Sequence, residues 1–510
     1  MKKIFLSLIF ILSSFLSFSQ EQGLDKKIDE AFAPISDFFS YYVFYPIAGY
    51  PFVILLLIGS AAFFTIYFGF PNLRYFSTSI NVVRGNYDEI EKDDSGSKDG
   101  EVSHFQALAT AVSGTVGNGN IAGVALAIAL GGPGATFWMI ICGFIGMSSK
   151  FVECTLGVKY RDIGEDGTVY GGPMYYLTKG LKEKGFQNLG KAAAVFFAIF
   201  CIGGSFGGGN AAQANQATIV LKQLLGFEST SAGAIIGLIL AVLVGIIIIG
   251  GIKRIASVTE KVVPFMAVLY LIACLYVLLI NFSLIDDAIS LIITEAFNPT
   301  AIGVGGFIGV LMVGFKRAAF SNEAGVGSAS IAHSAVKTKY AASEGLVALL
   351  EPFIDTVVIC TMTALVIIIF NFGGYFEYGG DGLGVVMIDG VPFEGAGITS
   401  QAFAQYIPFS DVFLTLAVVL FAVSTMISWS YYGLQSWKYL FGRGQIADLT
   451  YKVIFCMFVI IGSAASMNSI WAFSDAMIFA MVFPNMIGLF FLFPVVKKEL
   501  QRYLKAIKSI

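Results

Sequence analysis

Glycine and amide residues interrupt a long apolar stretch of this sequence. The run SGTVGNGNIAG, residues 113–123, contains four glycines and two asparagines, which are poor helix formers. At membrane depth, a broken helix is tolerated only where protein or a water-filled cavity satisfies its backbone. Its free N–H and C=O groups can bind an anionic carboxylate and a cation side by side. The run therefore predicts a transporter site for a small solute that carries a carboxylate.

A second interrupted run lies in the other half of the chain. FSNEAGVGS, residues 320–328, is also punctuated by glycine within an apolar surround. For either run alone, a helix-packing interface made of small residues is an equally good interpretation. Interrupted segments at matching positions of two halves are the best sequence indication of a midplane site. The two runs together therefore favour a binding site.

Amide side chains recur in a third apolar segment. In GGGNAAQANQ, residues 207–216, Asn210 and Gln213 are three apart, so we expect them to share one helix face. An amide both donates and accepts hydrogen bonds, which suits a zwitterionic solute. Hydrogen bonding between neighbouring helices is the alternative for a single amide.

Hydroxyls occur at helical spacing in STMISWSYY, residues 424–432. Thr425 lies three residues before Ser428 and four before Trp429, so we expect all three on one face. Hydroxyls together with the carbonyls of a broken helix form an oxygen site that fits Na⁺, and Trp429 would wall the pocket. Hydroxyl bonding within the helix is the alternative.

Acidic residues in or beside the apolar segments are further candidates, because ionisable groups at membrane depth commonly bind cations or relay protons. We expect some of them to pair with Lys150, Lys316 or Arg317. Glu323 is the most interesting, although we assign it no proton role. The candidates are Glu153, Glu323, Glu344, Glu351, Asp355 and Asp475.

One motif raises an enzymatic alternative. Residues 203–207 match G-x-S-x-G, a pattern found around some serine nucleophiles. Such a match arises easily by chance in a chain with 57 glycines, and the only two histidines are His104 and His333. An intramembrane serine hydrolase is thus the remaining enzymatic alternative. We expect no enzyme and no cofactor, since HExxH, Walker A and dinucleotide motifs are absent.

Composition defines the class of protein. The 510 residues are 56% hydrophobic and 13% charged, with a mean hydropathy of +0.79, which indicates a polytopic membrane protein in contact with the lipid bilayer. A pI near 5.6 and the lack of a basic tract argue against nucleic acid as a partner. The six cysteines lie in apolar segments without CxxC spacing and are expected to be buried hydrophobes.

Eleven apolar segments are expected to cross the membrane. Lys and Arg are concentrated in alternate connections, whereas 281–300 and 371–410 contain neither. The positive-inside rule then places the C-terminus in the cytoplasm and, with an odd number of spans, the mature N-terminus outside. The segments are 48–70, 104–131, 134–158, 189–217, 231–250, 256–280, 301–330, 341–371, 409–437, 447–468 and 472–496.

The first twenty residues have the layout of a secretory signal peptide. Lys2 and Lys3 precede an apolar run with several serines, residues 4–18, and Gln20 follows. An uncleaved anchor helix is the alternative, although the run is short for a span. Cleavage would place the mature N-terminus outside, in agreement with the charge pattern.

Ten segments remain after the first span and divide into two sets of five. Five is odd, so the second set would insert upside down relative to the first, as in an inverted-topology repeat. The broken helices would then be the second and seventh of the eleven. We predict a signal peptide at 1–20; a periplasmic segment, accessory helix and cytoplasmic linker at 21–103; repeats at 104–280 and 301–496, with an external loop at 371–410; and a cytoplasmic tail at 497–510.

Blocks of this sequence resemble the alanine/glycine:cation symporter family, also called sodium:alanine symporters. The resemblance implies an all-α, LeuT-like core of five plus five helices preceded by one accessory helix. It also implies Na⁺-coupled symport of small neutral amino acids, alanine or glycine, across the inner (plasma) membrane by alternating access. The blocks are GNGNIAGVA (117–125), GGPGA (131–135), YGGPMYY (170–176), FSNEAGVGSA (320–329) and WSYYG (429–433).

The same resemblance implies roles for individual residues. The broken backbone would receive the substrate carboxylate, amides would line the polar side, and Trp429 with Phe320, rather than Phe315, would close the pocket. Ser113 and Asn118 stand where threonine is more usual in the family, and serine keeps the hydroxyl. The implied substrate-binding residues are Ser113, Gly114, Asn120, Gln213, Phe320 and Trp429, and the implied Na⁺ ligands are Thr425, Ser428 and Ser113.

Other transport classes remain open. Coupling to H⁺ instead of Na⁺, or facilitated diffusion, would need the same kind of site. A channel would need a ring of charges or carbonyls along a pore, and the sequence predicts no helix with a continuous polar stripe that could line one. A nutrient receptor that kept the transporter fold is a further alternative.

Overall fold

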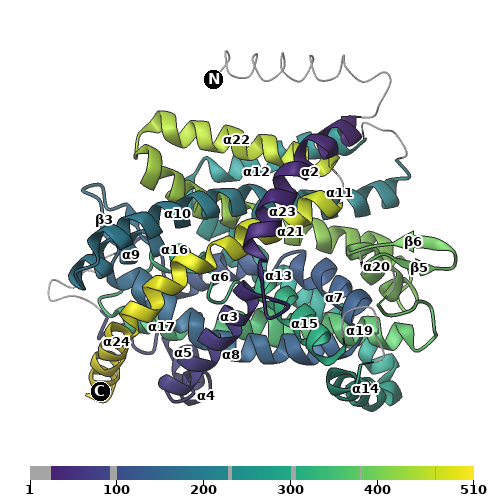
Figure 1. Cartoon of the computed structure of the whole chain (residues 1–510), viewed down its shortest axis with the longest axis horizontal. Helices are drawn as coiled ribbons and strands as arrows, with labels where there is room; N and C mark the ends of the chain where they lie inside the picture. Colours follow the sequence, from purple (N-terminus) through teal and green to yellow (C-terminus); the bar gives the residue numbers. More distant parts are fainter. Residues whose placement is uncertain are drawn as a thin grey trace.

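The computed structural model describes residues 24–91, 100–227, 232–299, 306–379, 382, 384–465 and 467–509. The predicted signal peptide lies outside these ranges. Within them the chain is built almost entirely of helices (Figure 1). Among the described residues, seven helices are long and apolar enough to cross a membrane, or up to eight if a bent pair counts as one span. The predicted all-helical polytopic membrane protein is confirmed, and the count of eleven spans stays a prediction.

Before the first predicted repeat, the chain forms a helix that the sequence pattern did not predict. This helix, α2, packs along α23 near the other end of the chain, with Phe39 and Phe473 ring centroids 6.4 Å apart. Charged residues alternate with apolar ones in this helix, so the sequence contains no long apolar run here. The elements of this part are α2 (Leu24–Val43), β1 (Pro46–Ile47), β2 (Tyr50–Pro51), α3 (Phe52–Tyr67), α4 (Pro71–Arg74) and α5 (Phe76–Val83).

The second predicted span is broken, as expected. Helix α6 starts at a capping box in which Ser103 and Gln106 satisfy each other's backbone N–H groups. It ends at Thr115, and α7 continues at an angle of 51°. The elements are α6 (His104–Thr115), α7 (Val124–Gly131), α8 (Gly134–Lys159), β3 (Asp162–Ile163), β4 (Val169–Tyr170), α9 (Pro173–Glu183), α10 (Gln187–Phe206), α11 (Ala212–Leu225), α12 (Ala232–Ile248) and α13 (Gly251–Ile280).

The seventh predicted span is broken too. Helix α15 ends at Asn322, and Glu323, Gly325 and Gly327 follow with φ values of 55°, 84° and 97°. Left-handed backbone cannot continue a helix, so the chain restarts in α16. The elements are α14 (Ile285–Phe297), α15 (Gly306–Asn322), α16 (Ala329–His333), α17 (Ala341–Ala348), α18 (Leu350–Pro352) and α19 (Thr361–Asn371).

In the described part of the chain, three π-helical turns interrupt the helices beside these breaks. They are Gly119–Gly123 before α7, Gly207–Ala211 between α10 and α11, and Phe353–Cys360 between α18 and α19. A π-helical turn changes the face on which later side chains lie, and such turns are frequent at functional sites. A short 3₁₀ turn, Phe282–Leu284, precedes α14.

The glycine-rich connection at 371–410 folds over the first break. Thr399 Oγ1 donates to Ile121 O at 3.1 Å, and the Ala396 N–H donates to Gln216 Oε1 at 3.1 Å. Through these two hydrogen bonds the connection covers the first break; its position outside the membrane stays a prediction. The last elements are β5 (Val386–Ile388), β6 (Val391–Phe393), α20 (Ala396–Ala404), α21 (Ser410–Phe441), α22 (Gln445–Ala464), α23 (Met467–Ala480) and α24 (Val482–Ile507).

Candidate functional site

The two broken helices lie against each other in the centre of the molecule. A Cβ placed on Gly119 of the first break would lie 3.4 Å from Ser321 Cα of α15. Long helices from both halves surround this contact, among them α8 and α21 (Figure 1). The structure therefore brings the two interrupted runs, which are distant in sequence, into one buried region.

Two amide side chains hold the backbone of the first break. Asn120 Oδ1 accepts the Gly117 N–H at 2.9 Å, and Gln213 Oε1 accepts the Asn118 N–H at 3.0 Å. Gln213 Nε2 donates to Gly208 O at 2.9 Å and so also fixes the π-helical turn of its own segment. The predicted polar residues Asn120 and Gln213 thus lie at the break, where they satisfy N–H groups that a helix would have used.

Hydroxyls of α21 meet the end of α6 beside these amides. Thr425 Oγ1 donates to Ser113 O at 3.0 Å, and Ser113 Oγ donates to Ser424 O at 2.7 Å. Ser428 Oγ is buried and has no hydrogen-bond partner among the described residues. These neutral oxygens form the type of donor set that suits Na⁺. The described residues contain no group of three or more His, Cys, Asp or Glu side chains that could hold a metal ion.

Glycine is required where the first break approaches α21. A Cβ on Gly117 would overlap Thr425 Oγ1 and would lie 3.1 Å from Gln213 Oε1. A Cβ on Gly114 would lie 2.9 Å from the Tyr432 hydroxyl oxygen, so the predicted residue Gly114 faces an aromatic ring. The predicted residues Ser113, Gln213 and Thr425 therefore converge on one short stretch of backbone.

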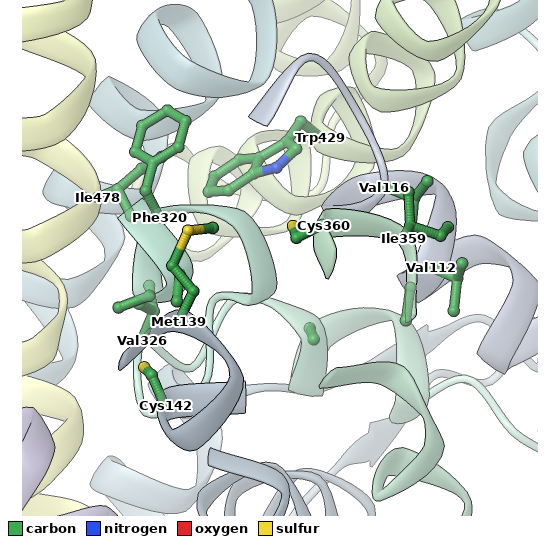
Figure 2. Packing of buried hydrophobic residues seen from close by; sticks show 14 of the residues in the cluster. Val112, Val116, Met139, Cys142, Phe320, Val326, Ile359, Cys360, Trp429 and Ile478 are labelled. Carbon is green, nitrogen blue, oxygen red and sulfur yellow. The ribbon is translucent and has the colours of Figure 1, made fainter. Parts of the chain in front are cut away.

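Aromatic rings cover the region, as Figure 2 shows for Phe320 and Trp429. Phe320 stacks on Trp471 with ring centroids 5.2 Å apart, and Trp429 packs directly on Gly209. Trp429 Nε1 donates to Glu323 Oε1 at 2.9 Å, and Ser328 Oγ donates to the other carboxylate oxygen. The Trp429 side chain therefore connects α21 to the second break through a hydrogen bond.

Asn210 and Gln213, which we expected on one helix face, bond to different neighbours. Asn210 does not share a neighbour with Gln213, since Asn210 Nδ2 donates to Phe455 O of α22 at 2.7 Å. Asn210 belongs to the π-helical turn Gly207–Ala211, whereas Gln213 lies in the α-helix that follows, so the regular helical spacing on which the expectation rested does not hold across the two. For Asn210 the alternative, a bond between helices, is the observed one.

Three of the other acidic candidates, Glu153, Glu351 and Asp475, are paired with the cations that the sequence suggested. Lys150 Nζ lies 3.1 Å from Glu351 Oε1 and 3.8 Å from Glu153 Oε1. Asp475 pairs with Arg317 and, at 2.9 Å, with Lys316. Paired ions of this kind are buried at lower cost than isolated ones.

Both histidines are bound to carboxylates. His104 contacts Glu91 at 2.6 Å and also Glu344, and His333 contacts Glu344 at 2.6 Å. Ser205 Oγ instead donates to Ile202 O and accepts from Tyr451. No serine–histidine pair forms at the G-x-S-x-G match, as a nucleophile would require.

The structure adds residues that the sequence pattern did not place in the site. Asp355 accepts from Asn120 Nδ2 at 2.7 Å, and Ser321 Oγ lies within 3.1 Å of both its carboxylate oxygens. Asp355 was one of six acidic candidates, and its spacing in the sequence did not indicate that it lies at the site. Trp471 lies beside an ordinary apolar segment, and no motif or spacing in the sequence indicated that it belongs to the site.

The sequence model of the sodium:alanine symporter family matches residues 39–510 of this chain. The chain is 38% identical to the sodium/alanine symporter AgcS of Methanococcus maripaludis over 454 residues, which cover 89% of this chain and 94% of AgcS. It is 34% identical to the amino-acid carrier protein AlsT of Bacillus subtilis, covering 93% and 92% of the two chains.

Among solved structures, the chain is similar to MhsT in complex with L-phenylalanine. The two share 14% of their residues, and the match has a TM-score of 0.50 and covers 79% of this chain and 99% of MhsT. At this identity the similarity concerns the fold alone, which is that of LeuT-type transporters. The predicted fold class is therefore confirmed.

Proposed function

Because this chain belongs to the sodium:alanine symporter family of cation-coupled amino-acid symporters, we propose that it couples Na⁺ entry to the uptake of a small neutral amino acid, alanine or glycine. One observation carries the proposal: the broken backbone after Ser113 is bound by Gln213 and Asn120 and is contacted by the Thr425 hydroxyl. Half-helix ends at the centre of a membrane protein are the recurrent sites for a carboxylate and a cation.

The substrate would bind at the first break, with its carboxylate near the backbone of Ser113 and Gly114. Gln213 and Asn120 hold that backbone open, and Trp429 and Phe320 would close over the substrate. The family and the relative AgcS are both named for alanine. This supports alanine or glycine over a larger amino acid.

The coupling ion would bind between α6 and α21. Thr425 Oγ1, Ser113 O and Ser428 Oγ are the proposed ligands. The buried Ser428 hydroxyl, which has no partner among the described residues, supports this assignment because buried polar groups are normally bonded. All three are neutral oxygens, so Na⁺ would keep its charge and could offset that of the substrate carboxylate.

Coupling then follows from electrostatics. A carboxylate leaving water needs compensation inside the protein, and a nearby Na⁺ supplies it. Each solute therefore binds more tightly when the other is present, with one reciprocal coupling free energy. Closure around both would allow alternating access, and the membrane potential contributes about 2.3 kcal/mol per charge per 100 mV.

The topology that fits this mechanism is the one that the charge pattern predicts. The chain would lie in the inner membrane with its mature N-terminus outside and its C-terminus in the cytoplasm. The inverted repeats would be 104–280 and 301–496, each with one of the two broken helices. Rocking of one repeat against the other would then open the site to either side.

Uptake of labelled L-alanine into proteoliposomes tests the function. We expect accumulation above equilibrium with an inward Na⁺ gradient, and none with an equal K⁺ gradient, because Na⁺ is the proposed coupling ion. Equal uptake in the two salts would contradict Na⁺ coupling and favour H⁺ coupling or facilitated diffusion. Empty vesicles provide the baseline.

A further inference from the structure

A cavity of about 300 Å³ lies where the end of α3 meets α24. Its wall includes two cations, Arg74 of α4 and Lys497 of α24, and the rings of Tyr67 and Tyr75. Helices α3 and α24 lie beside each other (Figure 1), and the turn from α3 into α4 completes the wall. Among the described residues that line it there is no Asp or Glu. This cavity, the Arg74 cavity, is therefore cationic.

A tight reversal of the chain positions Arg74. Gly69 and Phe70 have φ values of 68° and 59°, so α3 cannot continue through them. Helix α4 then starts at Pro71, whose fixed φ suits the first position of a helix. A Cβ on Gly69 would lie 3.1 Å from Arg74 Nη1, which shows that the guanidinium group folds back over this turn. The reversal therefore holds Arg74 at the end of α3.

Aromatic packing between α3 and α24 positions Lys497. The Phe493 ring of α24 packs on two rings of α3, with centroid distances of 5.4 Å to Phe63 and 4.6 Å to Tyr67. Lys497 lies one helical turn beyond Phe493, and its Nζ is 4.7 Å from the centre of the Tyr67 ring. An ammonium group over a ring is attracted to it and keeps N–H donors for another ligand.

Neither cation of the Arg74 cavity is neutralised by the protein. Among the residues that the structure describes, Arg74 and Lys497 form no ion pair with a carboxylate. The carboxylate of α24 nearest to Lys497 in sequence is Glu499, which pairs instead with Lys159 at 2.5 Å and Arg502 at 3.5 Å. Both charges are thus available to an anionic ligand.

Two further cavities of similar size show the contrast. One, of about 260 Å³, has Asp88 in its wall. The other, of about 310 Å³, has Asp162, which forms ion pairs with Lys179 and Arg443. In these cavities a carboxylate of the chain itself contributes negative charge. In the described wall of the Arg74 cavity no such carboxylate competes with a ligand.

The surface beside the Arg74 cavity is apolar. Ile66, at the end of α3, is 69% exposed, and Phe63, one turn before it, is 37% exposed. Phe490 of α24 is 38% exposed and packs on Phe63 with ring centroids 5.7 Å apart. Exposed apolar side chains on helices of a membrane protein are suited to contact with acyl chains. The cavity thus combines free cations with a neighbouring surface for lipid tails.

The predicted topology places this cavity at the cytoplasmic surface of the membrane. It lies at the ends of the predicted spans 48–70 and 472–496, and the positive-inside rule puts both ends in the cytoplasm. Tyrosine, lysine and arginine are typical residues at headgroup level. The cytoplasmic leaflet is the one that carries anionic phospholipids, and basic pockets between helices on that side bind their headgroups.

We propose that the Arg74 cavity binds the headgroup of an anionic phospholipid, whose acyl chains lie along Ile66 and Phe490. The Arg74 guanidinium group presents a planar set of N–H donors that matches phosphate oxygens, and Lys497 adds a second positive charge. A lipid bound there contacts both α3 and α24. This inference does not depend on the substrate or the coupling ion proposed above.

Native mass spectrometry of the purified full-length protein in a neutral detergent, titrated with phosphatidylglycerol, tests the proposal. We expect the Kd of the first bound lipid to rise about fivefold in Arg74→Gln and in Lys497→Gln, and about 25-fold in the double variant, as for single cations near an anionic surface. Both side chains are exposed, so we expect the variants to fold. Thermal melting without added lipid checks this, and the single variants suffice if the double variant does not fold.

Lys498→Gln/Lys508→Gln is the matched control. It removes the same charge from exposed positions near the end of α24 that do not line the cavity, and it should keep the Kd within about twofold of the wild type. An equal loss of binding in the two double variants would show only the attraction of a basic surface and would overturn the proposal. Unchanged binding in Arg74→Gln/Lys497→Gln would overturn it too.

Two other ligands separate an anionic lipid from a neutral lipid and from free phosphate. Phosphatidylcholine carries a phosphate but no net charge and should bind at least about fivefold more weakly than phosphatidylglycerol. A ligand of the folded state raises the melting temperature, so phosphatidylglycerol should raise it and inorganic phosphate at the same concentration should not. Equal binding of the two lipids, or a shift with inorganic phosphate that is lost in Arg74→Gln/Lys497→Gln, would contradict an anionic-lipid site.

Discussion

Gln213→Ala reduces the initial rate of Na⁺-driven alanine uptake by about 100-fold. The substitution leaves the Asn118 N–H and the Gly208 carbonyl without their partners in a buried region. Each buried polar group left unpaired costs about 1–3 kcal/mol. Loss of both hydrogen bonds is therefore sufficient to lower the uptake rate by this factor. The measurement is the uptake of labelled alanine into proteoliposomes at fixed Na⁺.

Gln223→Ala is the matched control for this prediction. Gln223 lies on the same helix, α11, but is exposed, so its loss should leave the rate within about twofold of the wild type, as for most surface substitutions. If Gln213→Ala is folded and transports as fast as Gln223→Ala, the first break is not held by this amide during transport.

The second large effect is expected from Gly117→Ala. The added methyl group would overlap Thr425 Oγ1 and crowd Gln213 Oε1, so the proposed Na⁺ ligand must move away. Overpacking of this kind costs about 1–3 kcal/mol, and the Na⁺ concentration for half-maximal uptake should rise by about 10- to 100-fold. A Na⁺ titration of alanine uptake measures it.

Gly59→Ala adds the same methyl group where no atom lies within 4 Å and should leave the Na⁺ titration unchanged. An unchanged titration in folded Gly117→Ala would place the coupling ion away from Thr425. Because Gly117 does not adopt a left-handed conformation, alanine introduces no backbone strain there. The comparison of Gly117→Ala with Gly59→Ala therefore measures only the effect of steric overlap with Thr425.

The two breaks could be located from the sequence because glycine and amides within an apolar span are costly unless the protein uses the backbone that they free. The first break could also be matched with Gln213 and Thr425, since hydroxyls and amides stand out in apolar segments. The structure brings these residues together, and their roles as ligands stay predictions. The fold class followed from the composition, from the two breaks and from the resemblance to the symporter family, and the structural neighbours confirm it.

Other features could not be predicted from local pattern. Asn210 and Gln213 have helical spacing, but Asn210 lies in a π-helical turn, and the two amides bond to different neighbours. The position of Asp355 depends on Asn120 and Ser321, which lie far from it in sequence. Helix α2 has no long apolar run, because charged residues interrupt it, and its position depends on its contact with α23. All of these features depend on tertiary contacts that periodicity does not encode.

The polar groups at the centre of the molecule are suited to exchanging their partners. Asn120, Gln213 and Thr425 each bond to backbone atoms of the first break or of the segment before it. Such bonds can exchange for bonds to a bound carboxylate or cation without leaving a group unsatisfied.

Equilibrium binding of labelled L-alanine to the purified protein, in Na⁺ and in K⁺ at equal ionic strength, tests the central claim most directly. We predict a Kd at least about tenfold lower in Na⁺, with alanine lowering the Kd for Na⁺ by the same factor, because the coupling free energy is reciprocal. The same Kd in both salts would contradict a site in which the cation compensates the carboxylate.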